Sequence, residues 1–93
     1  MNTTSIDYRS VNGRIRSCLA KTLEIPFEEI RNDVDIGEYG ADSLVMALVA
    51  GDMNAHFGIP VPYAEDMAHI STVEDLSEFF LQSAQNLPQQ PHG

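Results

Sequence analysis

The 93-residue sequence has one cysteine, Cys18, and no long apolar run. A single cysteine cannot form an internal disulfide, so nothing in the composition indicates an oxidising compartment. Because no stretch of about 18 apolar residues is present, a membrane-spanning helix is excluded, and the first residues lack the pattern of a secretory signal. We therefore expect a soluble cytoplasmic protein. A chain of this length has room for one domain only.

Basic residues are also scarce, with five Lys and Arg against fourteen Asp and Glu, and all five precede Asn32. A surface this acidic repels phosphate backbones and anionic lipid, which argues against nucleic-acid and membrane partners. It attracts basic protein surfaces and speeds encounters with them. The same acidity is equally explained as a device that keeps a small domain soluble.

The usual signatures of metal binding and catalysis are missing. The three histidines and the cysteine have no zinc-ligand spacing. The acid-rich segment around Asp33 places Ile36 where a calcium-binding EF-hand loop needs glycine. Asp42, Ser43 and His56 would supply the residue types of a hydrolase triad, but no G-x-S-x-G elbow surrounds the serine. We predict no metal site, and a hydrolase is a minor alternative. Cys18 is interpreted as a small residue of the hydrophobic core.

Apolar spacing predicts three main helices and one short helix. Val11, Ile15 and Leu19 recur every four residues, as in an amphipathic helix, and Pro26 stops that helix. Glycine, proline and capping residues delimit the others. We expect helices over residues 8–23, 42–57, 64–70 and 72–85, with an irregular stretch over residues 26–41. Residues 1–6 are expected to be a flexible N-terminus, residues 7–85 a domain, and residues 86–93 a disordered tail.

The most informative segment is GADSL, residues 40–44. Asp42 is a preferred helix N-cap, which places the Ser43 hydroxyl at the start of a long helix, beside unpaired backbone N–H groups. A phosphate ester on that hydroxyl would lie at the positive end of the helix dipole. Helix capping alone also explains Asp42 and Ser43. The pentapeptide by itself leaves both interpretations open.

The segment resembles the phosphopantetheine attachment motif of acyl carrier proteins. The resemblance extends over residues 11–84 and includes LEIPFEEI (23–30), residues 43–57 with the following GIPVP (58–62), and ISTVEDL (70–76). It implies an all-α, acyl-carrier-protein-like four-helix bundle and a non-catalytic carrier. A phosphopantetheinyl transferase would attach 4′-phosphopantetheine to Ser43, with Asp42 and Leu44 beside it. The arm would present acyl thioesters to partners such as a ketosynthase or an acyltransferase.

The same resemblance implies a cavity that shelters the acyl chain between the second, third and fourth helices. The candidates for its lining are apolar residues from three segments, each of which equally fits an ordinary core position: Val49, Met53, Phe57, Val61 and Phe79.

The second helix departs from the pattern of fatty-acid carriers, whose exposed face is acidic there. The matching positions in this chain are Val45, Leu48, Asn54 and Ala55. Residues 44–50 are all apolar, which is more than one buried helix face can account for. An exposed apolar patch usually marks a partner site. We predict a partner surface anchored by Leu44, Ala47 and Leu48, with the acids Asp52, Glu65 and Asp66 steering the approach.

These departures favour a discrete carrier in polyketide or related biosynthesis. We expect a monomer, because nothing in the sequence indicates a stable oligomer. A carrier for primary fatty-acid synthesis is the alternative within the family, and an unmodified acidic helical adaptor is the alternative outside it. A peptidyl carrier is disfavoured because Ala41 stands where those proteins usually have a second glycine before the aspartate.

Overall fold

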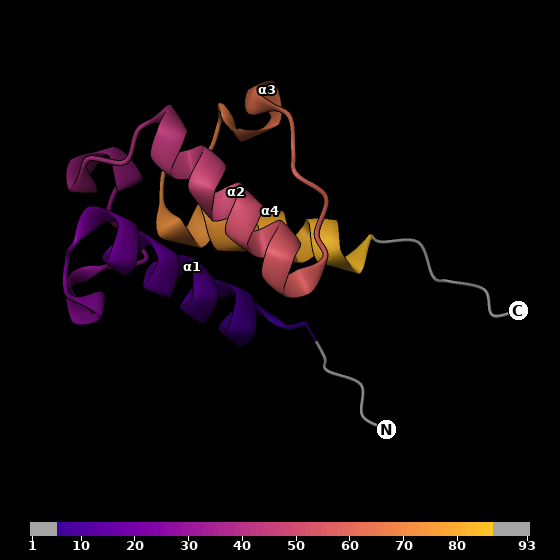
Figure 1. The fold of residues 1–93 in the computed structure, drawn as a ribbon, viewed down its shortest axis with the longest axis horizontal. Coiled ribbons are helices and arrows are strands. Elements are labelled where there is room, and N and C mark those ends of the chain that lie inside the picture. Colours follow the sequence, from indigo (N-terminus) through magenta and orange to yellow (C-terminus); the bar gives the residue numbers. More distant parts are fainter. Residues whose placement is uncertain (1–5, 87–93) are drawn as a thin grey trace, which may run out of the picture.

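The computed structural model describes residues 6–86, and these residues are helical apart from turns and connecting segments (Figure 1). The elements are α1 (Tyr8–Leu23), the short 3₁₀ helices η1 (Phe27–Glu29) and η2 (Ile36–Tyr39), α2 (Ser43–Phe57), α3 (Ala64–Met67) and α4 (Val73–Gln85). The described part of the chain contains no strand, only an isolated bridge between Asp35 and Thr72. The predicted all-α bundle of three main helices and one short helix is confirmed.

The helix boundaries follow from local capping chemistry. The Asp7 side chain accepts a hydrogen bond from the Ser10 N–H at the start of α1. Thr72 and Asp75 form a reciprocal capping box at the start of α4. Gly58, with a φ of 73°, ends α2 in the left-handed conformation that glycine adopts without strain.

The third helix is shorter than predicted. It ends at Met67, whereas the sequence pattern predicts helix to residue 70. Past this point the N–H of Ala68 bonds to the Glu65 carbonyl and that of Ile70 bonds to the Met67 carbonyl. These hydrogen bonds join residues three positions apart, so they make tight turns in place of a further α-helical turn.

The predicted flexible termini fall mostly outside the described residues. Residues 1–5 and 87–93 are not described, so those parts of the prediction stay untested. Ile6, at the edge of the predicted flexible N-terminus, packs against the hydrophobic core.

The hydrophobic core lies where α1 packs against α2 and α4. Figure 1 shows α3 on the side of the bundle away from α1. Fully buried core side chains come from each long helix and from two connecting segments: Val11, Ile15, Leu19, Ile30, Val49, Met53, Ile59, Val73, Leu76 and Phe80. Burial of these side chains supplies the main favourable contribution to folding.

Hydrogen bonds from the buried Asn12 fix the long segment between α1 and α2. The Asn12 Nδ2 donates to Asn32 Oδ1 at 2.8 Å and to Ser77 Oγ at 3.0 Å, and so connects α1, this segment and α4. Ile30 and Ile36 bury their side chains on either side of Asn32 in sequence. The segment is therefore held in place at the end of the bundle that leads into α2.

An ion pair joins α1 to α2. The Arg14 guanidinium donates to the Asp52 carboxylate, with Nε and Oδ2 2.8 Å apart. These hydrogen bonds hold the pKa of Asp52 below its ordinary value of 3.8. The pair therefore stabilises the fold fully at pH values above the pKa that Asp52 has in the unfolded chain. This stabilisation is lost as the pH falls through the lower pKa that Asp52 has in the folded protein.

We expect Asp52→Asn to lower the free energy of unfolding by less than about 1 kcal/mol at neutral pH, because the pair is partly exposed. Urea denaturation should show the parent and the variant converging as pH is lowered from about 5 to below about 3. A difference in the free energy of unfolding that persists below about pH 3 would contradict a stabilising role for the Asp52 charge.

Candidate functional site

Ser43 is the first residue of α2, and its side chain is exposed. The segment just before α2 contains Gly40, whose φ of 89° is one that glycine adopts without strain, and Asp42, the N-cap of α2. The Asp42 Oδ1 accepts a hydrogen bond from the Val45 N–H at 3.0 Å, and the Asp42 carbonyl accepts one from Met46. Within the described chain, the N–H groups of Ser43 and Leu44 are the unpaired donors of this helix start.

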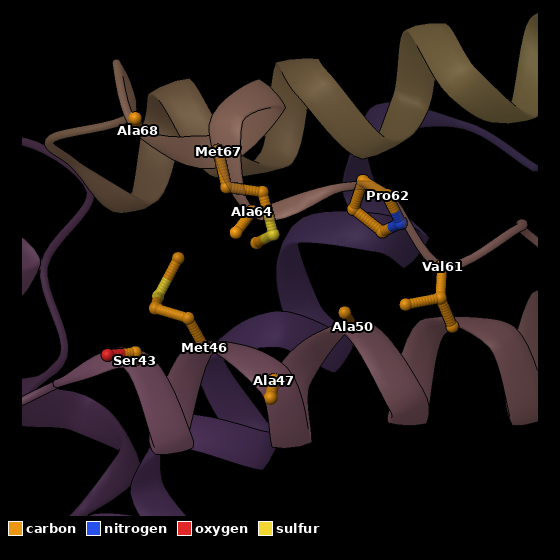
Figure 2. A pocket seen from close by; sticks show the side chains of 9 residues that line it. All are labelled: Ser43, Met46, Ala47, Ala50, Val61, Pro62, Ala64, Met67 and Ala68. Carbon is orange, nitrogen blue, oxygen red and sulfur yellow. The ribbon is translucent and has the colours of Figure 1, made fainter.

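An apolar pocket of about 310 Å³ adjoins Ser43, between α2 and the segment that contains α3 (Figure 2). Its lining comprises Ser43, Met46, Ala47, Ala50, Val61, Pro62, Ala64, Met67 and Ala68. Figure 2 shows Ser43 at one end and Val61 at the other, with Met46 and Met67 entering from opposite walls. Ser43 supplies the only polar side chain of this lining.

The pocket and the predicted acyl cavity share a single residue, Val61, which is 60% exposed. Val49 and Met53 are fully buried in the core. Phe57 and Phe79 are partly buried against the core, and Phe79 also lines a shallower depression together with Val61. A cavity role for these five residues stays a prediction.

Most residues of the pocket lining carry no recognisable signal in the sequence. Met46 belongs to the all-apolar run, where periodicity does not separate one helix face from another. Ala64 and Met67 come from a helix of only four residues, which is too short to show a periodic pattern. The placement of α3 over α2 creates the pocket, and no local signal encodes that placement.

The exposed face of α2 is apolar near Ser43, as predicted. Leu44 is 68% exposed, Leu48 is 49% exposed, and Ala47 is also exposed. Val45, one of the positions matched to the acidic face of fatty-acid carriers, is instead buried in the core. The structure corrects that placement, because Val45 lies four residues before the buried Val49 and shares its helix face.

The predicted steering acids occupy two different environments. Asp52 is the only carboxylate on α2, and its charge is offset by Arg14. Glu65 and Asp66 are exposed on α3, where Asp66 also accepts a hydrogen bond from the Tyr63 N–H. The acids of α3 are thus better placed than Asp52 to act on an approaching charge.

The catalytic alternatives find no support in the geometry. His56 lies in the last turn of α2, about 20 Å along the helix from Ser43, so the residue types of a triad are not brought together. Cys18 packs against the core, and burial raises the pKa of its thiol, which disfavours the reactive thiolate. The described residues hold no cluster of metal-binding side chains. None of their helices is long and apolar enough to cross a membrane.

The Asp42 cap provides a stability test of the site. We expect Asp42→Ala to lower the free energy of unfolding by about 1 kcal/mol, because the Val45 N–H loses its acceptor. Asp42→Asn should retain most of the stability, since asparagine caps as well as aspartate. Urea denaturation measures both. Equal losses in the two variants would contradict a capping role.

Comparison with known families agrees with this geometry. The family model described as "Phosphopantetheine attachment site" matches residues 13–80, a span that contains Ser43, α2 and α3. No curated protein and no solved structure matches the chain.

Proposed function

The chain belongs to the phosphopantetheine-attachment family, and we propose that it is an acyl carrier protein with 4′-phosphopantetheine attached to Ser43. This family is defined by that covalent cofactor, and its members are generally non-catalytic carriers that interact with a phosphopantetheinyl transferase and with acyl-processing enzymes. When bound, the cofactor supplies a terminal thiol that holds an acyl group as a thioester.

The observation that carries the proposal is the exposed Ser43 hydroxyl at the start of α2. The free N–H groups of Ser43 and Leu44 and the positive end of the helix dipole favour a phosphodiester there. Asp42 holds this helix start in shape through its bond to Val45. An apolar pocket beside the serine fits an arm that carries an apolar cargo.

The exposed face of α2 supports a narrower proposal, that the carrier serves polyketide or related biosynthesis. Leu44, Ala47 and Leu48 would contact the partner enzyme through apolar surface, while Glu65 and Asp66 would steer its approach. The only acid on α2 is already paired. A carrier for primary fatty-acid synthesis is the alternative, and it would require docking led by charge.

Intact mass tests the attachment. The protein is incubated with coenzyme A, magnesium and a broad-specificity phosphopantetheinyl transferase, and we expect the addition of one phosphopantetheine. If several transferases add nothing to protein whose helical circular dichroism is normal, the carrier proposal fails and the acidic-adaptor interpretation replaces it.

A further inference from the structure

The Tyr39 side chain bonds to the backbone of a residue eight positions earlier. Tyr39 is the last residue of η2 and is partly buried against the hydrophobic core. Its hydroxyl oxygen accepts a hydrogen bond from the Arg31 N–H at 2.8 Å. A phenylalanine could fill the same space, but it has no oxygen to accept this bond. The hydroxyl therefore joins η2 to Arg31 in a way that packing alone does not.

The backbone of Arg31 is itself held on both sides. The Ile30 side chain before it is fully buried, and the Ile30 carbonyl accepts a hydrogen bond from the Arg16 Nε at 2.9 Å. Asn32 after it accepts a hydrogen bond from the Asn12 side chain of α1. The Tyr39 hydroxyl therefore bonds to a point of the chain that α1 already fixes.

The first residue of η2 has an attachment of its own. The Ile36 N–H donates to the Ser71 carbonyl at 2.7 Å, and the Ile36 side chain is buried. A short helix held at one end can pivot about that end, whereas a helix held at both ends cannot. Ile36 supplies the first attachment and Tyr39 the second. The bond to Arg31 therefore fixes the direction in which the chain leaves η2.

This direction determines where α2 begins. The N–H groups of Gly40 and Ala41 donate to carbonyls within η2, and Asp42 then caps α2. Only three residues separate Tyr39 from Ser43, and each of them takes part in a hydrogen bond. Because these bonds connect η2 to the first turn of α2, a rotation of η2 would move the Ser43 hydroxyl with it.

Building on the proposed carrier function, we propose that Tyr39 is a positioning residue for phosphopantetheine transfer and acts through its bond to Arg31. In the transfer, the Ser43 oxygen bonds to the phosphorus next to the pantetheine of coenzyme A, and its proton passes to the transferase. The bond from that phosphorus to the bridging oxygen breaks, and adenosine 3′,5′-bisphosphate leaves. A small displacement of the attacking oxygen slows such a step strongly. Tyr39 does not touch Ser43 but holds the start of α2 in the orientation that the attack requires.

Tyr39→Phe tests this role, because it removes the hydroxyl and keeps the ring. We expect the kcat of phosphopantetheine transfer to fall about fivefold, since an ordinary hydrogen bond favours the bonded arrangement by about that factor. The KM for the carrier should stay within about twofold of the parent value, because the exposed face of α2 is unchanged. Steady-state kinetics with the transferase measures both constants, and circular dichroism confirms that the variant is folded.

Tyr8→Phe is the matched control. Tyr8 is also partly buried, and it begins α1, whose start lies toward the other end of the bundle from the start of α2 (Figure 1). Removal of its hydroxyl should leave kcat and KM at the parent values. An equal fall of kcat in the two variants would reflect a general effect of losing a tyrosine hydroxyl and would overturn the role of Tyr39.

Hydrogen exchange followed by NMR tests the positioning without any reaction. In Tyr39→Phe the Arg31 amide should exchange about fivefold faster, because it has lost its acceptor. The proposal requires faster exchange also at Ala41 and Val45, whose N–H groups bond to η2 and to the cap of α2. The Leu19 amide within α1 is the internal control and should not change.

The outcomes separate this proposal from the proposed function. Faster exchange confined to Arg31 would give the bond a local role only and would overturn the proposal, as would a Tyr39→Phe variant with the parent kcat. A higher KM at unchanged kcat would place Tyr39 on the docking surface and would also overturn it. If the parent protein itself gains no phosphopantetheine, the proposed function fails, and the role of Tyr39 in transfer fails with it.

Discussion

Ser43→Ala is expected to abolish the addition of phosphopantetheine and to leave the fold intact. The hydroxyl is exposed, and the cap of α2 depends on Asp42 rather than on the Ser43 side chain. Alanine is a good helix former at the first position of a helix, so no stability loss is expected. Intact mass after incubation with coenzyme A and the transferase should show the parent fully modified and the variant unmodified.

Ser71→Ala is the matched control for this experiment. Ser71 is also exposed and also lies near the start of a helix, two residues before the first residue of α4. Under the same incubation, the Ser71→Ala variant should gain the same mass as the parent. An adduct on Ser43→Ala, or its loss from Ser71→Ala, would move the attachment site away from α2 and would contradict the proposed function.

Most of the fold could be predicted from the sequence because its signals are local. The four-residue spacing of Val11, Ile15 and Leu19 defines α1, and its predicted range agrees with the structure. Asp42 and Gly58 delimit α2 through capping chemistry that involves only neighbouring residues. The position of Ser43 at a helix start follows from the same local rule.

What could not be predicted depends on residues distant in the sequence. The bond between Asn12 and Ser77 joins residues 65 positions apart, and neither residue type is expected in a core. The Arg14–Asp52 pair likewise depends on how α1 crosses α2. The pocket requires the placement of α3 over α2, so its lining by Met46 and Met67 had no local signal.

The apolar character of α2 now has a structural explanation. One face, with Val49 and Met53, is buried in the core. A second, with Met46, lines the pocket beside Ser43. A third, with Leu44 and Leu48, is exposed. A helix with three apolar faces has no clear hydrophobic direction, which is why periodicity could indicate that part of the run is exposed but could not divide the core from the pocket.

Leu48→Glu is expected to raise the KM of phosphopantetheine transfer and to leave kcat nearly unchanged. Leu48 is 49% exposed, so a carboxylate can be solvated there, and circular dichroism should match the parent. If Leu48 anchors the partner enzyme, its replacement should lower kcat/KM about thirtyfold, the effect typical of an interface hot spot of about 2 kcal/mol. Steady-state kinetics with the transferase measures the effect. Loss of the helical signal would show that Leu48 belongs to the core.

Whether kcat/KM falls or rises in Leu48→Glu distinguishes apolar docking from docking led by charge. The protein is already strongly acidic, and one more carboxylate on α2 should speed encounter with a basic partner if charge dominates recognition. Gln82→Glu adds the same charge at an exposed position on α4, away from this face, and should change kcat/KM little. A fall in kcat/KM that is confined to Leu48→Glu supports an apolar partner surface and the narrower biosynthetic proposal. A rise in Leu48→Glu would instead favour charge-led docking and the fatty-acid alternative, because the α2 face would then gain the acid it lacks.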